Sequence, residues 1–96
     1  MANEGKVGTP KTAQHVAAPR FQRVATRLAR RLRGLRTERR WTQEKAAERI
    51  GVEPAQVRRL ESARANPSLA LLVSVAAAFG VSVSRLLAPV NKREVD

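Results

Sequence analysis

The chain has 96 residues, enough for a single small domain. Its 19 lysines and arginines outnumber eight acidic residues and give a formal net charge of +11, which favours polyanionic partners, nucleic acid first and anionic lipid second. It contains no cysteine and no apolar run near the roughly 20 residues that span a bilayer, which argues against a disulfide framework, a cysteine-based metal site and a membrane span.

Residues 1–20 are expected to form a flexible basic tail. They show no apolar period and contain two glycines and two prolines, a composition typical of segments that bury no core. They lack the continuous apolar stretch of a signal peptide, so a cytoplasmic protein is expected. His15 has no carboxylate or second histidine near it in the sequence, so no metal or catalytic role is predicted for it.

An arginine-rich amphipathic helix is predicted from Phe21 to Arg39. Its apolar residues recur at steps of three and four and form one stripe, made of Phe21, Val24, Leu28, Leu32 and Leu35. Residues 20–40 contain nine arginines and one acid, so most of the excess charge lies here. Five of these arginines could follow flanking DNA phosphates, follow the minor groove from the tail, or bind an acidic protein partner. They are Arg20, Arg23, Arg27, Arg30 and Arg31.

Two short helices separated by a tight turn are predicted next. Thr42 is a favourable N-cap for the first, and Gly51 supplies the left-handed residue that ends it. Pro54 suits the first turn of the second helix. The pair is a helix-turn-helix candidate, in which the second helix, about residues 54–62, would be the recognition helix that enters the DNA major groove.

Two charged residues fall on predicted apolar faces. Arg36 follows Leu32 by four residues on the first helix, and Glu61 shares a face with Val57 on the third. Because burying either charge alone would be costly, a buried Arg36–Glu61 ion pair is predicted to hold the third helix against the first. The alternative is that both side chains reach solvent at the edges of their helices.

A fourth helix is predicted between the N-cap Ser68 and the terminating Gly80. Its expected apolar set is Leu69, Leu72, Val73, Ala76 and Phe79. A short fifth helix ends at Pro89, and its apolar residues Leu86 and Leu87 are the expected self-contact of a homodimer.

The predicted elements make an all-α fold, in which a compact five-helix domain spans residues 21–89 between the tail and a frayed C-terminus, residues 90–96. The chain resembles the Cro/λ-repressor-like helix-turn-helix family, also called the xenobiotic-response-element regulators, in the segments W-T-Q-E-K-A-A-E-R-I-G-V-E-P-A-Q-V-R-R-L-E, R-A-N-P-S-L and A-A-A-F-G-V-S-V-S-R-L-L. The resemblance implies sequence-specific DNA binding, frequent homodimers and the same Arg36–Glu61 pairing.

The resemblance and the predicted helix positions together indicate which residues contact DNA. Base contacts are expected from Ala55, Gln56 and Arg59, and phosphate contacts from Thr42, Gln43, Arg58, Arg64 and Asn66. Pro54 and Ala55 stand where the family often has glutamine or serine; neither can hydrogen-bond a base through its side chain, although both can touch a thymine methyl. Base reading is therefore expected to fall on Gln56 and Arg59.

Two other departures from the family concern the backbone. Arg40 stands where a glycine often ends the first helix, and Ala63 replaces a usual loop glycine. A left-handed conformation is unfavourable for residues other than glycine. Both positions are therefore expected to carry a mild strain without a change of fold.

The leading interpretation is a sequence-specific DNA-binding transcriptional regulator that binds as a dimer to an inverted repeat, with half-sites about one helical turn apart. A rival is a protein-interaction module, such as an antitoxin or a coactivator-like bridging factor, holding its partner through the arginine-rich first helix or the tail. A third possibility is a sequence-blind coat on DNA. No catalytic triad, apolar carboxylate pair or glycine-rich phosphate loop is visible, so no enzyme activity, cofactor, metal or membrane partner is expected.

Overall fold

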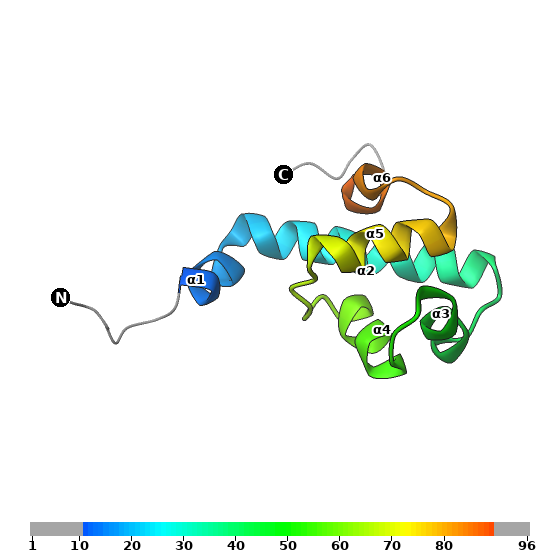
Figure 1. Cartoon of the computed structure of the whole chain (residues 1–96). Coiled ribbons are helices and arrows are strands. Elements are labelled where there is room, and N and C mark those ends of the chain that lie inside the picture. Colours follow the sequence, from blue (N-terminus) through cyan, green and yellow to red (C-terminus); the bar gives the residue numbers. More distant parts are fainter. Residues whose placement is uncertain (1–10, 90–96) are drawn as a thin grey trace.

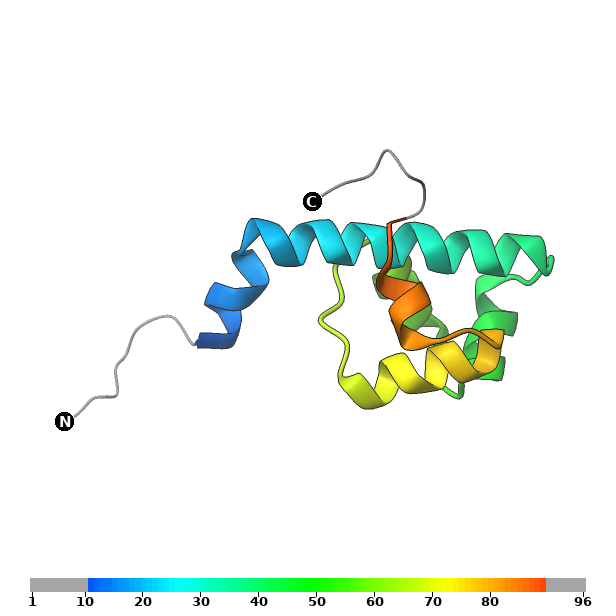
Figure 2. The same cartoon turned by 90° about the horizontal axis from the view of Figure 1, so that it is seen from above.

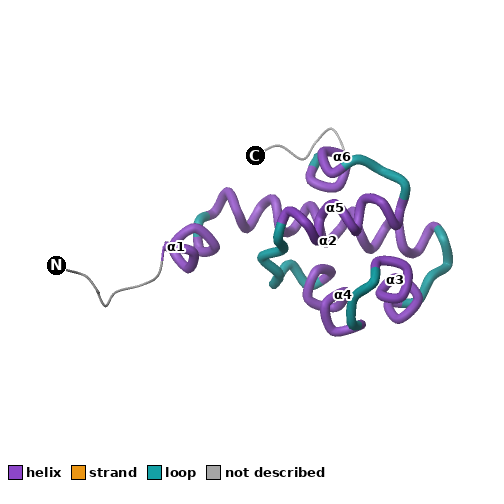
Figure 3. Tube along the Cα trace, viewed as in Figure 1, coloured by secondary structure: helices purple, strands orange, loops and turns teal. Residues whose placement is uncertain are grey.

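The computed structural model describes residues 11–89, and all regular structure in that range is helical (Figures 1 and 3). The helices are α1 Lys11–Ala17, α2 Pro19–Glu38, α3 Gln43–Ile50, α4 Pro54–Glu61, α5 Leu69–Phe79 and α6 Val83–Leu87. The predicted all-α helix-turn-helix fold is confirmed, with one short helix more than expected. None of the described helices is both long and apolar enough to cross a membrane.

The additional helix is α1, which lies in the stretch for which a flexible tail is predicted. Residues 11–17 contain neither glycine nor proline, so no residue in them opposes a helix. The Gln22 side-chain amide donates to the Val16 carbonyl at 2.7 Å and ties α1 to α2. Figures 1 and 2 show α1 and the start of α2 projecting beyond the body of the domain. The absence of an apolar period here reflects this peripheral position.

The long helix α2 is the spine of the domain. α3 and α4 lie on one side of it, α6 lies on the other, and α5 packs against α3 and α6 (Figures 1 and 2). Leu28, Leu32 and Leu35 form its buried stripe as predicted, joined by Ala25 and Ala29. These alanines suit close approach of neighbouring helices in a small core. The predicted stripe members nearest α1, Phe21 and Val24, are only half-buried.

Aliphatic side chains fill the core. The chain has only three aromatic residues, and two of them, Trp41 and Phe79, pack with ring centroids 5.2 Å apart. The Arg39 guanidinium lies over the Phe79 ring, with its carbon 5.2 Å from the ring centroid. Trp41 is therefore a core-edge residue, packed against the buried cluster.

The predicted buried face of α5 is partly wrong. Val75, Ala76 and Phe79 are buried, but Leu69 is 71% exposed and Val73 53% exposed. The helix L-A-L-L-V-S-V-A-A-A-F is apolar on nearly every side, so its periodicity does not indicate which side faces the core.

The predicted self-contact on the last helix is wrong for Leu86. Leu86 is fully buried within the domain and Leu87 is half-buried against the same core. α6 is only five residues long, and its large apolar side chains pack against the core of the same chain. Leu86 is therefore not available to a partner, whereas Leu87 remains partly exposed.

Candidate nucleic-acid interface

The turn between α3 and α4 is tight because one glycine reverses the chain. Gly51 has φ of 92°, in the left-handed region that favours glycine, and its N–H donates to the Ala47 carbonyl at 2.8 Å. The next N–H, of Val52, donates to the same carbonyl at 3.0 Å. Pro54 then occupies the first turn of α4. The two helices pack against each other as a helix-turn-helix unit.

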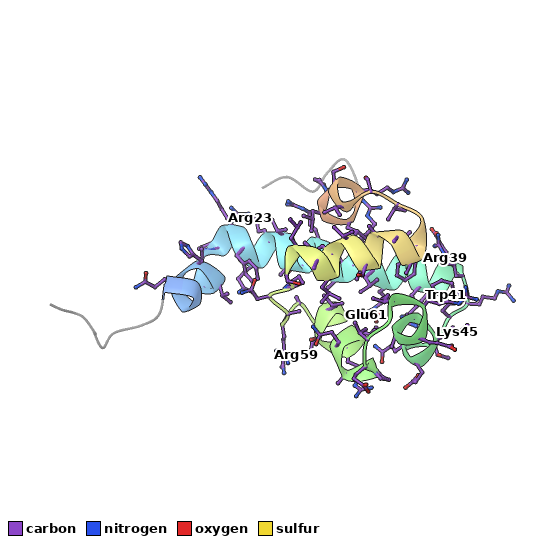
Figure 4. All side chains as sticks on the ribbon, viewed as in Figure 1. Arg23, Arg39, Trp41, Lys45, Arg59 and Glu61 are labelled. Atoms are coloured by element: carbon purple, nitrogen blue, oxygen red, sulfur yellow. The ribbon has the colours of Figure 1, made fainter. Side chains whose placement is uncertain are left out.

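Helix α4 divides sharply into a buried face and an exposed face. Val57, Leu60 and Glu61 are buried. The opposite side presents a continuous row at i, i+3, i+4 and i+7, made of Ala55, Arg58, Arg59 and Ser62, all exposed. Figure 4 shows Arg59 extending away from α2. We call this row the α4 outer face.

The three residues predicted to contact bases all lie on this helix but differ in exposure. Ala55 and Arg59 lie on the α4 outer face, whereas Gln56 is half-buried beside Pro54. The Gln56 N–H donates to the Glu53 carbonyl at 2.9 Å. The exposed small side chain of Ala55 lets a flat ligand approach the helix closely, with Arg59 as the long reaching side chain.

Behind the α4 outer face, Arg36 and Glu61 form the ion pair that their spacing predicts. Arg36 Nε donates to Glu61 Oε2 at 2.6 Å, and Arg36 Nη2 donates to Glu61 Oε1 at 2.9 Å. The Glu61 side chain is 2% exposed and the Arg36 side chain 15% exposed. This bidentate geometry is the strong form of an arginine–carboxylate contact. Hydrogen bonding to Glu61 raises the pKa of Arg36 above its ordinary value, against the opposing effect of burial.

Additional contacts with the pair could not be read from spacing. Gln43 Nε2 donates to Glu61 Oε1 at 3.1 Å, and Arg33 Nη2 donates to the Glu61 backbone carbonyl at 3.1 Å. Arg36 also donates through Nη1 to the Trp41 carbonyl at 2.9 Å. One carboxylate therefore joins α4 to both α2 and the start of α3.

The start of α3 lies beside this network. Thr42 caps the helix, and its hydroxyl oxygen accepts from the Lys45 N–H at 2.9 Å. Gln43, predicted to contact phosphate, is half-buried with its amide directed to Glu61. Its side chain thus orients α4 in the free protein. The positive end of the α3 dipole is at this point and favours an anion.

The segment after α4 follows a strained turn. Ala63 has φ of 62°, a left-handed value that is unusual outside glycine. The Arg64 N–H donates to the Arg59 carbonyl at 3.1 Å and closes the helix end. Arg64 and Asn66 are exposed on either side of the buried Ala65, which anchors the loop. Arg40 has φ of 58° at the end of α2, so both glycine-replacing residues adopt the left-handed conformation.

Arginines of the long helix donate hydrogen bonds to carbonyl groups of their own chain, a role that the sequence did not predict. Arg27 Nε donates to the Leu87 carbonyl at 3.1 Å, and Arg31 Nη2 donates to the Pro89 carbonyl at 3.0 Å. These bonds secure α6, whose C-terminal carbonyls have no helical partner. Arg39 does the same for α5, donating to the Phe79 carbonyl at 2.7 Å.

Arg23, one member of the predicted flanking-phosphate row, lies away from the α4 outer face. Figure 4 shows Arg23 and Arg59 projecting to opposite sides of the domain. A duplex lying along the α4 outer face is therefore on the far side of α2 from Arg23. The local charge near α4 comes instead from Arg58, Arg59 and Arg64, all exposed. Within residues 11–89 no group of three potential metal ligands is close enough to hold an ion.

The sequence of residues 32–86, which contains α3, α4 and the Arg36–Glu61 pair, matches the HTH_3 helix-turn-helix family. The chain belongs to this Cro/C1-type helix-turn-helix family. No curated protein matches the sequence significantly.

Solved structures that resemble this HTH_3 protein include three transcription-related proteins. A hypothetical transcription factor, NHTF, from Neisseria is 33% identical with a TM-score of 0.70, and the match covers 78% of this chain and 86% of that one. The restriction-modification controller protein C.AhdI from Aeromonas hydrophila is 29% identical with a TM-score of 0.61, over 65% of this chain and 94% of that one. An HTH_3 family transcriptional regulator from Vibrio cholerae, 24% identical with a TM-score of 0.64 over 69% of this chain and 37% of that one, shares the fold.

Proposed function

We propose that this HTH_3 protein is a transcriptional regulator that recognises a specific duplex DNA sequence with α4 as its recognition helix. The observation that carries the proposal is the α4 outer face, which stands exposed directly over the bidentate Arg36–Glu61 pair. A helix that reads bases must be held firmly from behind while its front stays open. The family assignment and the transcription-factor neighbours support the same function.

Each exposed side chain suits a different part of the duplex. Arg59 can donate two hydrogen bonds to guanine O6 and N7, and the methyl of Ala55 can contact a thymine methyl. Gln56, half-buried at the helix start, is assigned to an adenine or a nearby phosphate. This division leaves Arg59 as the main carrier of sequence preference.

The remaining DNA contacts are assigned to phosphate. Arg58 and Arg64 offer exposed guanidinium groups on either side of Arg59. Thr42 and Asn66 offer exposed polar groups at the start of α3 and in the loop after α4, and Gln43 is the first residue of α3. Such contacts fix the orientation of the protein on the duplex and carry no direct sequence information.

We further propose that the protein binds as a homodimer to an inverted repeat. A single α4 presents few base-reading side chains, and a two-fold pair doubles the sequence that is read. In vitro selection from a random duplex pool at moderate salt tests both statements. The expected result is one enriched sequence with two inverted half-sites about one helical turn apart. Equal affinity for random duplexes at matched salt would contradict sequence-specific recognition and would support sequence-independent coating of DNA.

The alternative of a protein-interaction module has less support. It relies on the arginine-rich helix or the tail as a docking surface, yet Arg27 and Arg31 of that helix already donate to carbonyls of their own chain. A stoichiometric protein partner recovered with the wild-type chain, and lost in an Arg23→Ala variant, would revive it.

A further inference from the structure

A solvent-exposed apolar patch lies on α5. Leu69 and Val73, 71% and 53% exposed, are the large hydrophobic side chains that stand exposed in the described part of the chain. They are one helical turn apart and therefore point to the same side. α5 is also the only one of the six described helices that has no charged side chain.

A groove opens beside this patch. It has a volume of about 110 Å³ and lies between the first turns of α2, the loop before α5 and the end of α6. Its walls are apolar apart from Asn66, and include Phe21, Val24, Leu28, Pro67, Leu72 and Leu87. Pro67 and Leu72 precede and follow Leu69 in the chain, so the projecting leucine and the groove are neighbours on one surface.

We propose that a second copy of this chain covers the patch, with Leu69 of each copy seated in the groove of the other. A two-fold contact must be self-complementary, so that each copy supplies both halves of the fit. A projecting leucine beside an apolar groove meets that requirement. The inference deepens the proposed function, since it rests on the proposed dimer and names the surface that forms it.

Charge favours the same contact. Two chains of net charge +11 repel each other, so a self-contact is least costly where charged groups are absent. The uncharged helix α5 provides that surface, whereas α2 and α4 both carry arginines. Leu86, which would have placed the contact on α6, is buried.

The contact also leaves the DNA-reading surface free. Figure 2 shows α5 along one edge of the domain with α2 at the opposite edge, and Figure 1 shows α4 below both. A two-fold axis beside α5 can therefore place the α4 helices of both copies on the same side of the dimer. Figure 4 shows Arg59 pointing to that side.

Sedimentation equilibrium without DNA tests the contact. The wild-type chain is expected to dimerise, and the double variant Leu69→Ser/Val73→Ser to weaken the dimer at least about tenfold in Kd. Both side chains are largely exposed, so this variant should fold, which thermal melting checks. The matched control is Ala70→Ser/Ser74→Ala, which changes neighbouring exposed positions of α5 and should leave the Kd unchanged.

A complementation experiment tests the reciprocal fit. Phe21→Ser alters a wall of the groove and should also weaken the dimer. When the Phe21→Ser chain is mixed with the Leu69→Ser/Val73→Ser chain, one of the two leucine–groove contacts is intact in the mixed dimer. Mixed dimers should therefore form at lower concentration than dimers of either variant alone.

Three outcomes would overturn the inference. One is a dimer that the Leu69→Ser/Val73→Ser change leaves unaltered, which would place the contact elsewhere. Another is mixed dimers no stronger than the variant dimers. The third is a wild-type chain that stays monomeric; a loss of thermal stability with these serines would then show that a segment of the same chain covers the patch. In each case, sequence-selective binding by the wild-type chain would show that the proposed DNA recognition stands without this interface.

Discussion

The Glu61 carboxylate accepts hydrogen bonds from Arg36 Nε at 2.6 Å and from Arg36 Nη2 at 2.9 Å, and so joins α4 to α2. The same carboxylate accepts from Gln43 at 3.1 Å, which adds α3 to the junction. The position of the α4 outer face relative to the rest of the domain depends on this one acid. Loss of either partner would leave a buried group without its counter-charge, which is more damaging than loss of an exposed pair.

Glu61→Gln is expected to lower the free energy of unfolding by about 3 kcal/mol. The amide keeps the shape but removes the charge that offsets Arg36. Urea unfolding measures the change. Glu48→Gln, at an exposed residue whose carboxylate lies 3.4 Å from Lys45, is the matched control and should cost well under about 1 kcal/mol. Equal small losses in the two variants would mean that the pair does not stabilise the fold.

The Arg36–Glu61 pair should not make stability fall at moderately alkaline pH. Because hydrogen bonding raises the pKa of Arg36 above its ordinary value, the stabilisation is present below that value and is lost only as pH rises through the raised pKa. Urea unfolding of wild type and Arg36→Met between about pH 7 and pH 10 should therefore show a constant difference. A difference that shrinks across this window would contradict the assignment.

Ala63→Gly and Arg40→Gly should each stabilise the protein by about 0.5–1 kcal/mol. Both residues have left-handed backbones, with φ of 62° and 58°, and relief of that strain exceeds the added freedom of glycine in the unfolded chain. Gly51→Ala, at φ of 92°, should destabilise for the converse reason. Thermal melting compares the three variants. A lower melting temperature for both glycine variants would show that the two turns are unstrained.

The ion pair, the left-handed residues and the boundaries of α3 and α4 could be predicted from sequence, because each is marked by a residue that is unusual at its position. Arg36 and Glu61 each place a charge on an apolar stripe, where an unpaired charge would be costly to bury. An ion pair between them is one of the few arrangements that offset this cost. The glycine positions of a known turn likewise identify Ala63 and Arg40 as left-handed. Gly51 and Pro54 mark the boundaries of α3 and α4 within one residue of those observed.

Other features have no local signal. Arg27 and Leu87 are bonded across 60 positions in the chain, and the acceptor is a backbone carbonyl that any residue would provide. The exposed side of α5 could not be identified because almost every position of that helix is apolar. Tertiary packing decides which arginines bind their own chain, and composition alone indicated only an acidic partner, either DNA or protein.

Arg27→Ala should loosen α6 without weakening DNA binding. It removes the bond to the Leu87 carbonyl, at a cost of about 1 kcal/mol. Hydrogen exchange should become faster in residues 83–87, whereas Arg23→Ala, on the same side of the domain, should leave that exchange unchanged. If instead Arg27→Ala reduced affinity for all duplexes equally with α6 intact, the α2 row would contact phosphate after all.

Arg64→Ala should weaken binding to all duplexes alike and make it less sensitive to salt. Each lost phosphate contact lowers the slope of log K against log salt by about 0.9 per copy. The slope is measured by titrating one duplex over a series of salt concentrations. An unchanged slope would remove Arg64 from the phosphate contacts.

The most direct test compares Arg59→Ala with Arg58→Ala by in vitro selection of duplexes at one salt concentration. Both arginines are exposed neighbours on the α4 outer face, so only their roles distinguish them. Arg59→Ala should lose preference at one base position in each half-site, at a cost of about 1–3 kcal/mol, while Arg58→Ala should keep the sequence and lose affinity. If Arg59→Ala selects the same sequence as wild type with undiminished preference at every position, α4 does not read DNA through Arg59 and the account of the site is wrong.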